Sequence, residues 1–280
     1  MPMFDLQTPP RYSLANAPLA QALGQVRYPL IADFDTMAGI APLQRELREQ
    51  FPYMQQEKVQ EFAFVAGPAG PASGAATETK TWNFTNDAGT LIVVGPGSTT
   101  LSIGAGYTDF SSFADDFERI LRALNVVGVP RCDRLGLRYL SAVGSTPGDA
   151  RPWAKWFRTE LLSWSGTNVI SETCSVSSIS QVQIDHPPAG DYSHFPSAIQ
   201  AVVRHGAVPA GTLVPGIPPI EMSERSYILD LDVFSEGNQP FNPTAIIEQF
   251  KALHIEIDRF FYWSMSDDGR SNFGLEVRDD

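Results

Sequence analysis

Two segments with wide apolar stripes at helical spacing limit most strongly how this chain can fold. The first, Tyr107–Val127, can be capped by Thr108 or Asp109, and Pro130 follows it. The second begins after Asn242, a capping residue with Pro243 at the first helical position. The two stripes are Phe110, Phe113, Phe117, Ile120, Leu121 and Leu124, and Ile246, Phe250, Leu253, Ile257, Phe260 and Phe261. Stripes this wide must be buried, so we expect each helix to pack on the antiparallel sheet that precedes it.

The same order of elements leads up to each of these helices. In the first half a strand at 22–30 and a helix at 42–51 precede strand candidates at 59–65, 80–85, 90–94 and 99–103. In the second half a strand at 135–143 and a helix at 153–164 precede strands at 175–184, 198–204 and 226–234. The opening strands also share similar text, Val26-Arg27-Tyr28 and Leu137-Arg138-Tyr139. The repetition predicts a tandem duplication with its boundary near Pro130.

We therefore predict an α+β protein whose two halves, residues 1–130 and 131–280, share one continuous core. Each half is a unit of strand, helix, three or four antiparallel strands and helix. This order resembles TATA-binding-protein-like saddles and helix-grip domains, although a shared fold does not carry function. A curved sheet with helices behind it leaves a concave face free for a protein or a ligand.

Charge and cysteine content narrow the functional classes. The 32 acidic residues outnumber the 20 lysines and arginines, which gives a net charge of −12 and argues against nucleic-acid binding. Cys132 and Cys174 are too few for a disulfide framework or a cysteine-built zinc site, and we expect both to be small buried hydrophobes. The sequence shows no secretory signal and no apolar run long enough to span a membrane, so we expect a cytoplasmic protein with no membrane partner.

Three arginines recur on the two opening strands. Arg134 and Arg138 are four residues apart on one strand face, and Arg27 occupies the equivalent place in the first half. Together they could bind an anion or an acidic partner. The alternative is that they form internal ion pairs with the abundant acidic residues.

Catalytic signatures are weak throughout. Asp230 and Asp232 share a strand face and could hold a divalent metal together with Asp185 and His186. The alternative is that the adjacent apolar residues point inward while both carboxylates face water. His254 lies in the expected last helix and is expected to be a flanking residue or a hydrogen-bonded boundary residue. The sequence has no nucleophile elbow, no metalloprotease motif and no phosphate loop, so we predict no cofactor, no bound metal and no catalytic residue.

Aromatic residues are unusually dense at two places. The expected helix at 153–164 carries Trp153, Trp156, Phe157 and Trp164, and the end of the last helix carries Phe261 and Trp263. One helix face cannot easily bury so many rings, so we expect an exposed remainder to form an interface with a partner or with a second copy of this chain in a homodimer.

Several short motifs resemble a known family. These are Arg134-Leu-Gly-Leu-Arg-Tyr139, Ala17-Pro18-Leu19, Trp82 on a strand, and His254 followed by Phe260-Phe261. They resemble a sporadically distributed, largely bacterial family of uncharacterised proteins of about this length. The resemblance brings no catalytic residues. The family's scattered distribution is typical of genes for defence, immunity or mobile elements.

The sequence thus predicts a non-catalytic protein that acts through protein–protein contacts, with a role in bacterial defence or toxin neutralisation. Its acidic surface would suit a basic partner such as a nuclease. One alternative is a small ligand held in a cavity between sheet and helices, with Arg134 or Arg138 at its mouth. A further alternative is a metal-dependent hydrolase centred on Asp185, His186, Asp230 and Asp232.

Overall fold

The computed structural model describes residues 2–61, 64–67, 70–73, 77–145, 153–166, 177–187 and 190–278. The helices are α1 (Met37–Leu47), α2 (Phe110–Val126), α3 (Trp153–Trp156), α4 (Thr159–Leu162), α5 (Pro243–Ser264) and α6 (Asp267–Asn272). Short 3₁₀ turns lie at Ala32–Asp35, Ser163–Gly166 and Gly190–Tyr192. The strands are β1 (Tyr12–Leu14), β2 (Leu19–Arg27), β3 (Tyr53–Glu61), β4 (Phe64–Gly67), β5 (Gly70–Ser73), β6 (Thr77–Thr85), β7 (Leu91–Gly95), β8 (Ser98–Ile103), β9 (Arg131–Gly144), β10 (Ser180–His186), β11 (Ile199–Val208), β12 (Leu213–Val214), β13 (Ile220–Glu221), β14 (Ser226–Pro240) and β15 (Leu275–Val277).

One antiparallel sheet of nine strands forms the body of the molecule, in the order β10-β11-β14-β9-β2-β8-β7-β6-β3. The two opening strands, β2 and β9, lie side by side at its centre. Within this sheet, the strands from residues 1–130 continue outward from β2, and those from residues 131–280 continue outward from β9. The predicted α+β class, with a large antiparallel sheet, is confirmed.

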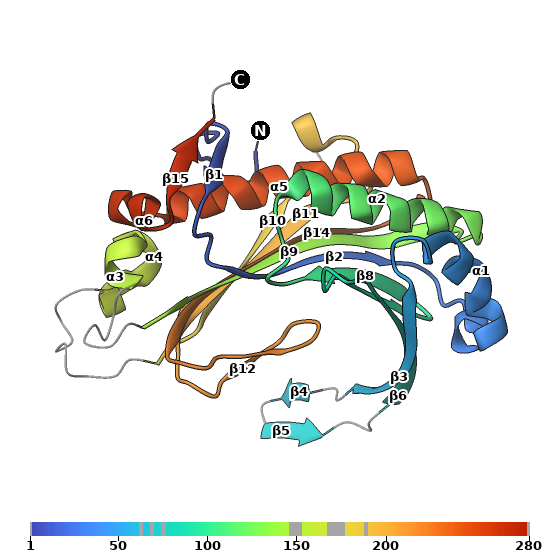
Figure 1. Ribbon diagram of the computed structural model, residues 1–280. Helices are drawn as coiled ribbons and strands as arrows, with labels where there is room; N and C mark the ends of the chain where they lie inside the picture. The colour runs from blue at the N-terminus through green and yellow to red at the C-terminus, as the bar shows by residue number, and fades with distance from the viewer. Residues whose placement is uncertain are drawn as a thin grey trace.

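Helices α1, α2 and α5 cover one face of this sheet, and Figure 1 shows α2 and α5 lying above it. The apolar stripes expected from the sequence provide the packing: Phe117 and Phe250 stack with their ring centres 4.2 Å apart. Gly24 on β2 leaves room for both rings, because a side chain there would come within 2.9 Å of Phe250. Asp109 and Asn242 cap α2 and α5 through their side chains.

The opposite face of the sheet is concave and carries no helix from the described part of the chain (Figure 1). We call it the helix-free face. The β12–β13 hairpin lies beneath it, and a small apolar cluster joins the two: Leu140, Val208, Val214, Met222 and Ile228. This hairpin covers part of the helix-free face beside β9 and β14.

The expected helix at 153–164 is wrong in its extent, because the segment is split into α3 and α4. The backbone between them bonds elsewhere: Phe157 forms a β-bridge with Met265, and Arg158 N–H donates to the carbonyl of Ser264 over 2.8 Å. Helix α1 starts earlier than expected, so Pro42 lies inside it instead of in its first turn. Cys174 and the first part of the strand expected at 175–184 lie outside the described residues.

Among the described residues, no helix is both long enough and apolar enough to cross a membrane.

Candidate functional site

A carboxylate buried under the helix-free face organises the arginines of the neighbouring strands. Asp230 on β14 is 2% exposed. Arg138 on β9 donates to its two oxygens from Nε and Nη2, over 2.6 and 2.9 Å. Arg204 on β11 adds an ion pair of 3.3 Å. Burial alone would lower the pKa of Arg138, but its bonds to Asp230 outweigh burial and raise it.

The β12–β13 hairpin closes over this buried pair. Arg138 Nη2 also donates to the carbonyl of Pro215, over 2.7 Å. Gln21 on β2 donates to the carbonyl of Ile217 over 2.7 Å, and the Ser102 hydroxyl donates to the same carbonyl. Arg138 is therefore engaged by a buried carboxylate and by the hairpin, which corresponds to the alternative of internal ion pairing.

Arg134 lies at the border between the covered and the open part of the helix-free face. Its guanidinium lies 4.2 Å from the ring centre of Phe234 and donates to Asp232 over 3.4 Å and to Gln25 Oε1 over 3.1 Å. Burial lowers the pKa of Arg134 despite the charge of Asp232, and the nearby Arg27 lowers it further. Burial likewise raises the pKa of Asp232. The side chain is thus charged, largely buried and only loosely paired.

Gly136 provides the space for this guanidinium. A Cβ at position 136 would lie 2.5 Å from Arg134 Nη1, so a larger residue would push the guanidinium away. Within Arg134-Leu-Gly-Leu-Arg-Tyr139, the glycine therefore positions the first arginine.

Arg27 lies directly opposite Arg134, on the paired strand β2. It is exposed, and its Nε donates to Gln25 Oε1 over 3.1 Å, so one amide oxygen accepts from both arginines. Among the described residues, no carboxylate lies within 4.0 Å of its side-chain nitrogens. The network of Arg27, Arg134, Arg138, Arg204, Asp230, Asp232 and Glu236 thus has four guanidiniums and three carboxylates, and the cationic excess lies at Arg27.

The residues expected to hold a metal do not converge. Asp185 and His186 are neighbours on β10, so their side chains point to opposite faces of the sheet, and His186 packs against Tyr192. Asp230 and Asp232 are bound by arginines. The part of the chain that the structure describes contains no group of three metal-ligating side chains. The expectation that Asp230 faces water is also wrong, because its arginine partners allow it to be buried.

Most of the expected interface aromatics pack within the chain. Trp153 and Phe157 are 3% and 2% exposed, so neither offers surface to a partner. Trp156, Phe261 and Trp263 are partly buried against the core or against other side chains. Trp164 is 63% exposed. The aromatic excess is smaller than the sequence suggests because Trp153, Trp156 and Phe157 pack against the rings of Tyr227 and Phe273.

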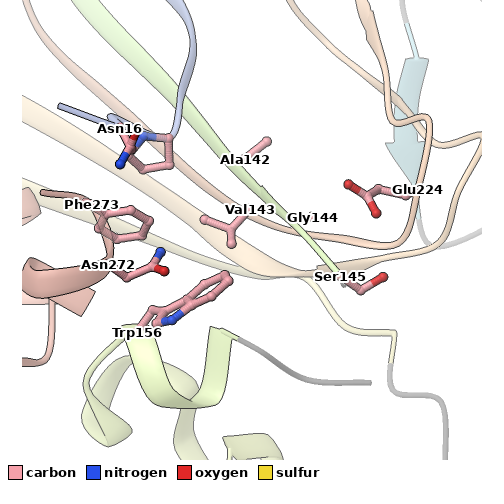
Figure 2. A pocket seen from close by; sticks show the side chains of 10 residues that line it. Asn16, Ala142, Val143, Gly144, Ser145, Trp156, Glu224, Asn272 and Phe273 are labelled. Atoms are coloured by element: carbon pink, nitrogen blue, oxygen red, sulfur yellow. The ribbon is translucent and has the colours of Figure 1, made fainter. Parts of the chain in front are cut away.

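The geometry does not support a ligand between the sheet and the helices with Arg134 or Arg138 at its mouth. Both arginines lie on the helix-free face, and stacked Phe117 and Phe250 fill the layer below α5. A cavity of about 450 Å³ lies elsewhere, between the end of β9 and α6 (Figure 2). Trp156 and Phe273 form one side of it, and Glu224 lies across from them. The described residues that line it include one carboxylate and no basic side chain, so we assign it no chemistry.

Comparison of the chain with protein-family models, curated proteins and solved structures finds no match in any of the three. The site is therefore defined by its geometry alone.

Four residues of the site were not predicted from the sequence: Gln25, Gly136, Arg204 and Phe234. The sequence did contain a signal for Gln25. It lies two residues from Arg27 on one strand, and this spacing places both side chains on the same face.

Proposed function

We propose that this chain is a non-catalytic binding protein that receives an acidic segment of a protein partner at Arg27 and Arg134. The observation that carries the proposal is the pairing of these two arginines on neighbouring strands, with one of them exposed and lacking a carboxylate partner among the described residues. A carboxylate placed between them could accept from both guanidiniums.

The surroundings of the two guanidiniums favour this use. Arg134 is held by Phe234, Gln25 and Gly136, so little side-chain freedom is lost when it binds. An added carboxylate would also relieve the repulsion between two adjacent cations. The net charge of −12 taken alone favours a basic partner, but the open part of this face presents cations, so the contact made here is with acidic groups.

The binding test uses a fluorescein-labelled glutamate-rich peptide, followed by fluorescence anisotropy at low salt and at about 0.15 M ionic strength. We expect saturable binding that salt weakens. Arg27→Gln removes the exposed cation and should weaken binding about tenfold, or about 1.4 kcal/mol. Gly136→Ala, which displaces the Arg134 guanidinium, should also weaken it.

Arg48→Gln is the matched control, because Arg48 is an exposed arginine at the end of α1 and its loss changes the net charge equally. If Arg27→Gln and Arg48→Gln weaken peptide binding equally, the effect comes from net charge alone and the site is refuted. Binding of a lysine-rich peptide of the same length in place of the glutamate-rich one would instead point to a basic partner.

We also propose that the two sides of the sheet arose by tandem duplication of a TATA-binding-protein-like half. This idea is supported by the strand order, which runs outward from β2 on one side and from β9 on the other, with α2 and α5 closing the corresponding halves. Cytoplasmic location, homodimer formation, membership of the sporadically distributed bacterial family and a role in defence or toxin neutralisation stay predictions from the sequence.

A further inference from the structure

A second group of cationic side chains surrounds a cavity at the far end of α5. The cavity measures about 280 Å³ and lies between the N-terminal segment 6–10 and the last turn of α5. We call it the Arg158–Arg270 pocket. Its lining residues are Leu6, Gln7, Thr8, Pro10, Arg158, Tyr262, Trp263 and Arg270. The described residues of this lining include two arginines and no acidic residue, in a chain whose net charge is −12.

Both guanidiniums lie against aromatic rings. Arg158 lies 6.0 Å from the ring centre of Trp263, and Arg270 lies 4.3 Å from that of Tyr262. An aromatic ring supports the flat side of a guanidinium and leaves its N–H groups free at the edge. The neighbouring rings Phe260 and Tyr12 pack against Trp263 and Tyr262, so both supports are fixed in place.

The described residues satisfy these two cations only in part. The Nε atoms of Arg158 and Arg270 are buried and have no hydrogen-bond partner among the described residues. No described carboxylate lies within 4.0 Å of Arg158, and the ion pair of Arg270 is with Asp267, whose side chain is 99% exposed. Buried donors without acceptors are rare in folded proteins, and beside a cavity a water, an ion or a ligand group can supply the missing acceptor.

The N-terminal wall of the pocket is anchored to α5 on both sides. The backbone N–H of Phe4 donates to Glu256 Oε2 over 3.2 Å, and the Tyr12 hydroxyl donates to Asp258 over 2.7 Å. Between these two points, Arg259 donates to the hydroxyl of Thr8 over 3.2 Å. The segment that closes the pocket is therefore held in one place before any ligand binds, which reduces the entropy lost on binding.

We infer that the Arg158–Arg270 pocket binds a small molecule through a doubly charged oxyanion group, either a phosphate or a pair of carboxylates. Two guanidiniums can neutralise two negative charges, and their N–H edges fit the oxygens of either group. The volume lies just below the usual range of sites for drug-sized ligands, so the ligand is small. This site is separate from the pair Arg27 and Arg134.

The test is a thermal-unfolding titration of the full chain with sodium phosphate and, separately, with sodium succinate, against sodium chloride at matched ionic strength. We expect Tm to rise in a saturable way with at least one of the two dianions and not with chloride. A rise with phosphate alone identifies a phosphate ligand, and a rise with succinate alone identifies a dicarboxylate. The inference is wrong if neither raises Tm beyond the chloride control.

Arg158→Met tests the residue assignment. It should weaken binding of the active anion at least tenfold, while Arg119→Met, which removes the same charge from a weakly paired arginine on α2, should leave binding unchanged. Without ligand, Arg158→Met should unfold at the same or a higher temperature, because it removes a buried donor that lacks an acceptor. Unchanged anion binding in Arg158→Met would overturn the site.

Discussion

At the scale of single residues, the partly buried ring of His254 on α5 sets a pH dependence. It stacks on Phe110 with ring centres 3.7 Å apart, and Tyr139 packs edge-on against it. Burial lowers the pKa of His254 from 6.5 to about 4. The sequence predicted a flanking or hydrogen-bonded boundary residue, and the structure shows a partly buried imidazole that packs against the rings of Phe110 and Tyr139.

We predict that the free energy of unfolding falls as pH drops from about 6.5 to about 4. In that interval the unfolded chain binds a proton at His254 and the folded chain does not, so stability decreases by about 1.4 kcal/mol per pH unit. Urea unfolding at a series of pH values measures the slope, and His254→Gln isolates this residue from the carboxylates that titrate nearby. An equally steep slope in His254→Gln would contradict the prediction.

At the scale of elements, the fit between β2 and the two long helices depends on one missing side chain. A Cβ at Gly24 would lie 2.9 Å from Phe250 on α5 and 3.1 Å from Phe117 on α2. Neither ring can move away easily, because each is fully buried.

We therefore predict that Gly24→Ala lowers the free energy of unfolding by about 1–3 kcal/mol through overpacking. Gly95→Ala on β7 is the control, since its nearest contact would be an ordinary 3.8 Å. A double-mutant cycle from urea unfolding tests the contact. Phe250→Leu should lower the free energy of unfolding less in the Gly24→Ala chain than in the native chain. Simple additivity of the two effects would show that the contact is not the cause.

The elements also show which parts of the fold local sequence can predict. Helices α2 and α5 were predictable because their caps, Asp109 and Asn242, and their stripes are all local signals. The break after Phe157 was not, because it depends on bonds to Ser264 and Met265 more than 100 positions away. The same holds for the site: spacing placed Arg134 and Arg138 on one face, but only the register of β9 against β14 decides that Arg138 is engaged by Asp230.

At the scale of the whole molecule, the two predicted halves are joined through contacts that neither could make alone. Strand β2 pairs with β9 across the middle of the sheet, and Phe117 from one half stacks on Phe250 from the other. The first strand, β1, pairs with the last, β15. Each half would expose a sheet edge and an aromatic helix face without its counterpart.

We therefore predict that the chain unfolds in a single cooperative transition, although chains of this length often populate intermediates. Phe84→Ala on β6 and Val203→Ala on β11 each remove a buried side chain. The two strands lie near opposite edges of the sheet, on either side of the β2–β9 junction. Scanning calorimetry should show one peak in each variant, shifted to lower temperature, with equal calorimetric and van't Hoff enthalpies. The larger deletion, Phe84→Ala, should cost about 3–5 kcal/mol and shift it further. Two peaks, of which each substitution moves only one, would mean that the halves are independent domains and that the junction at β2 and β9 contributes little to stability.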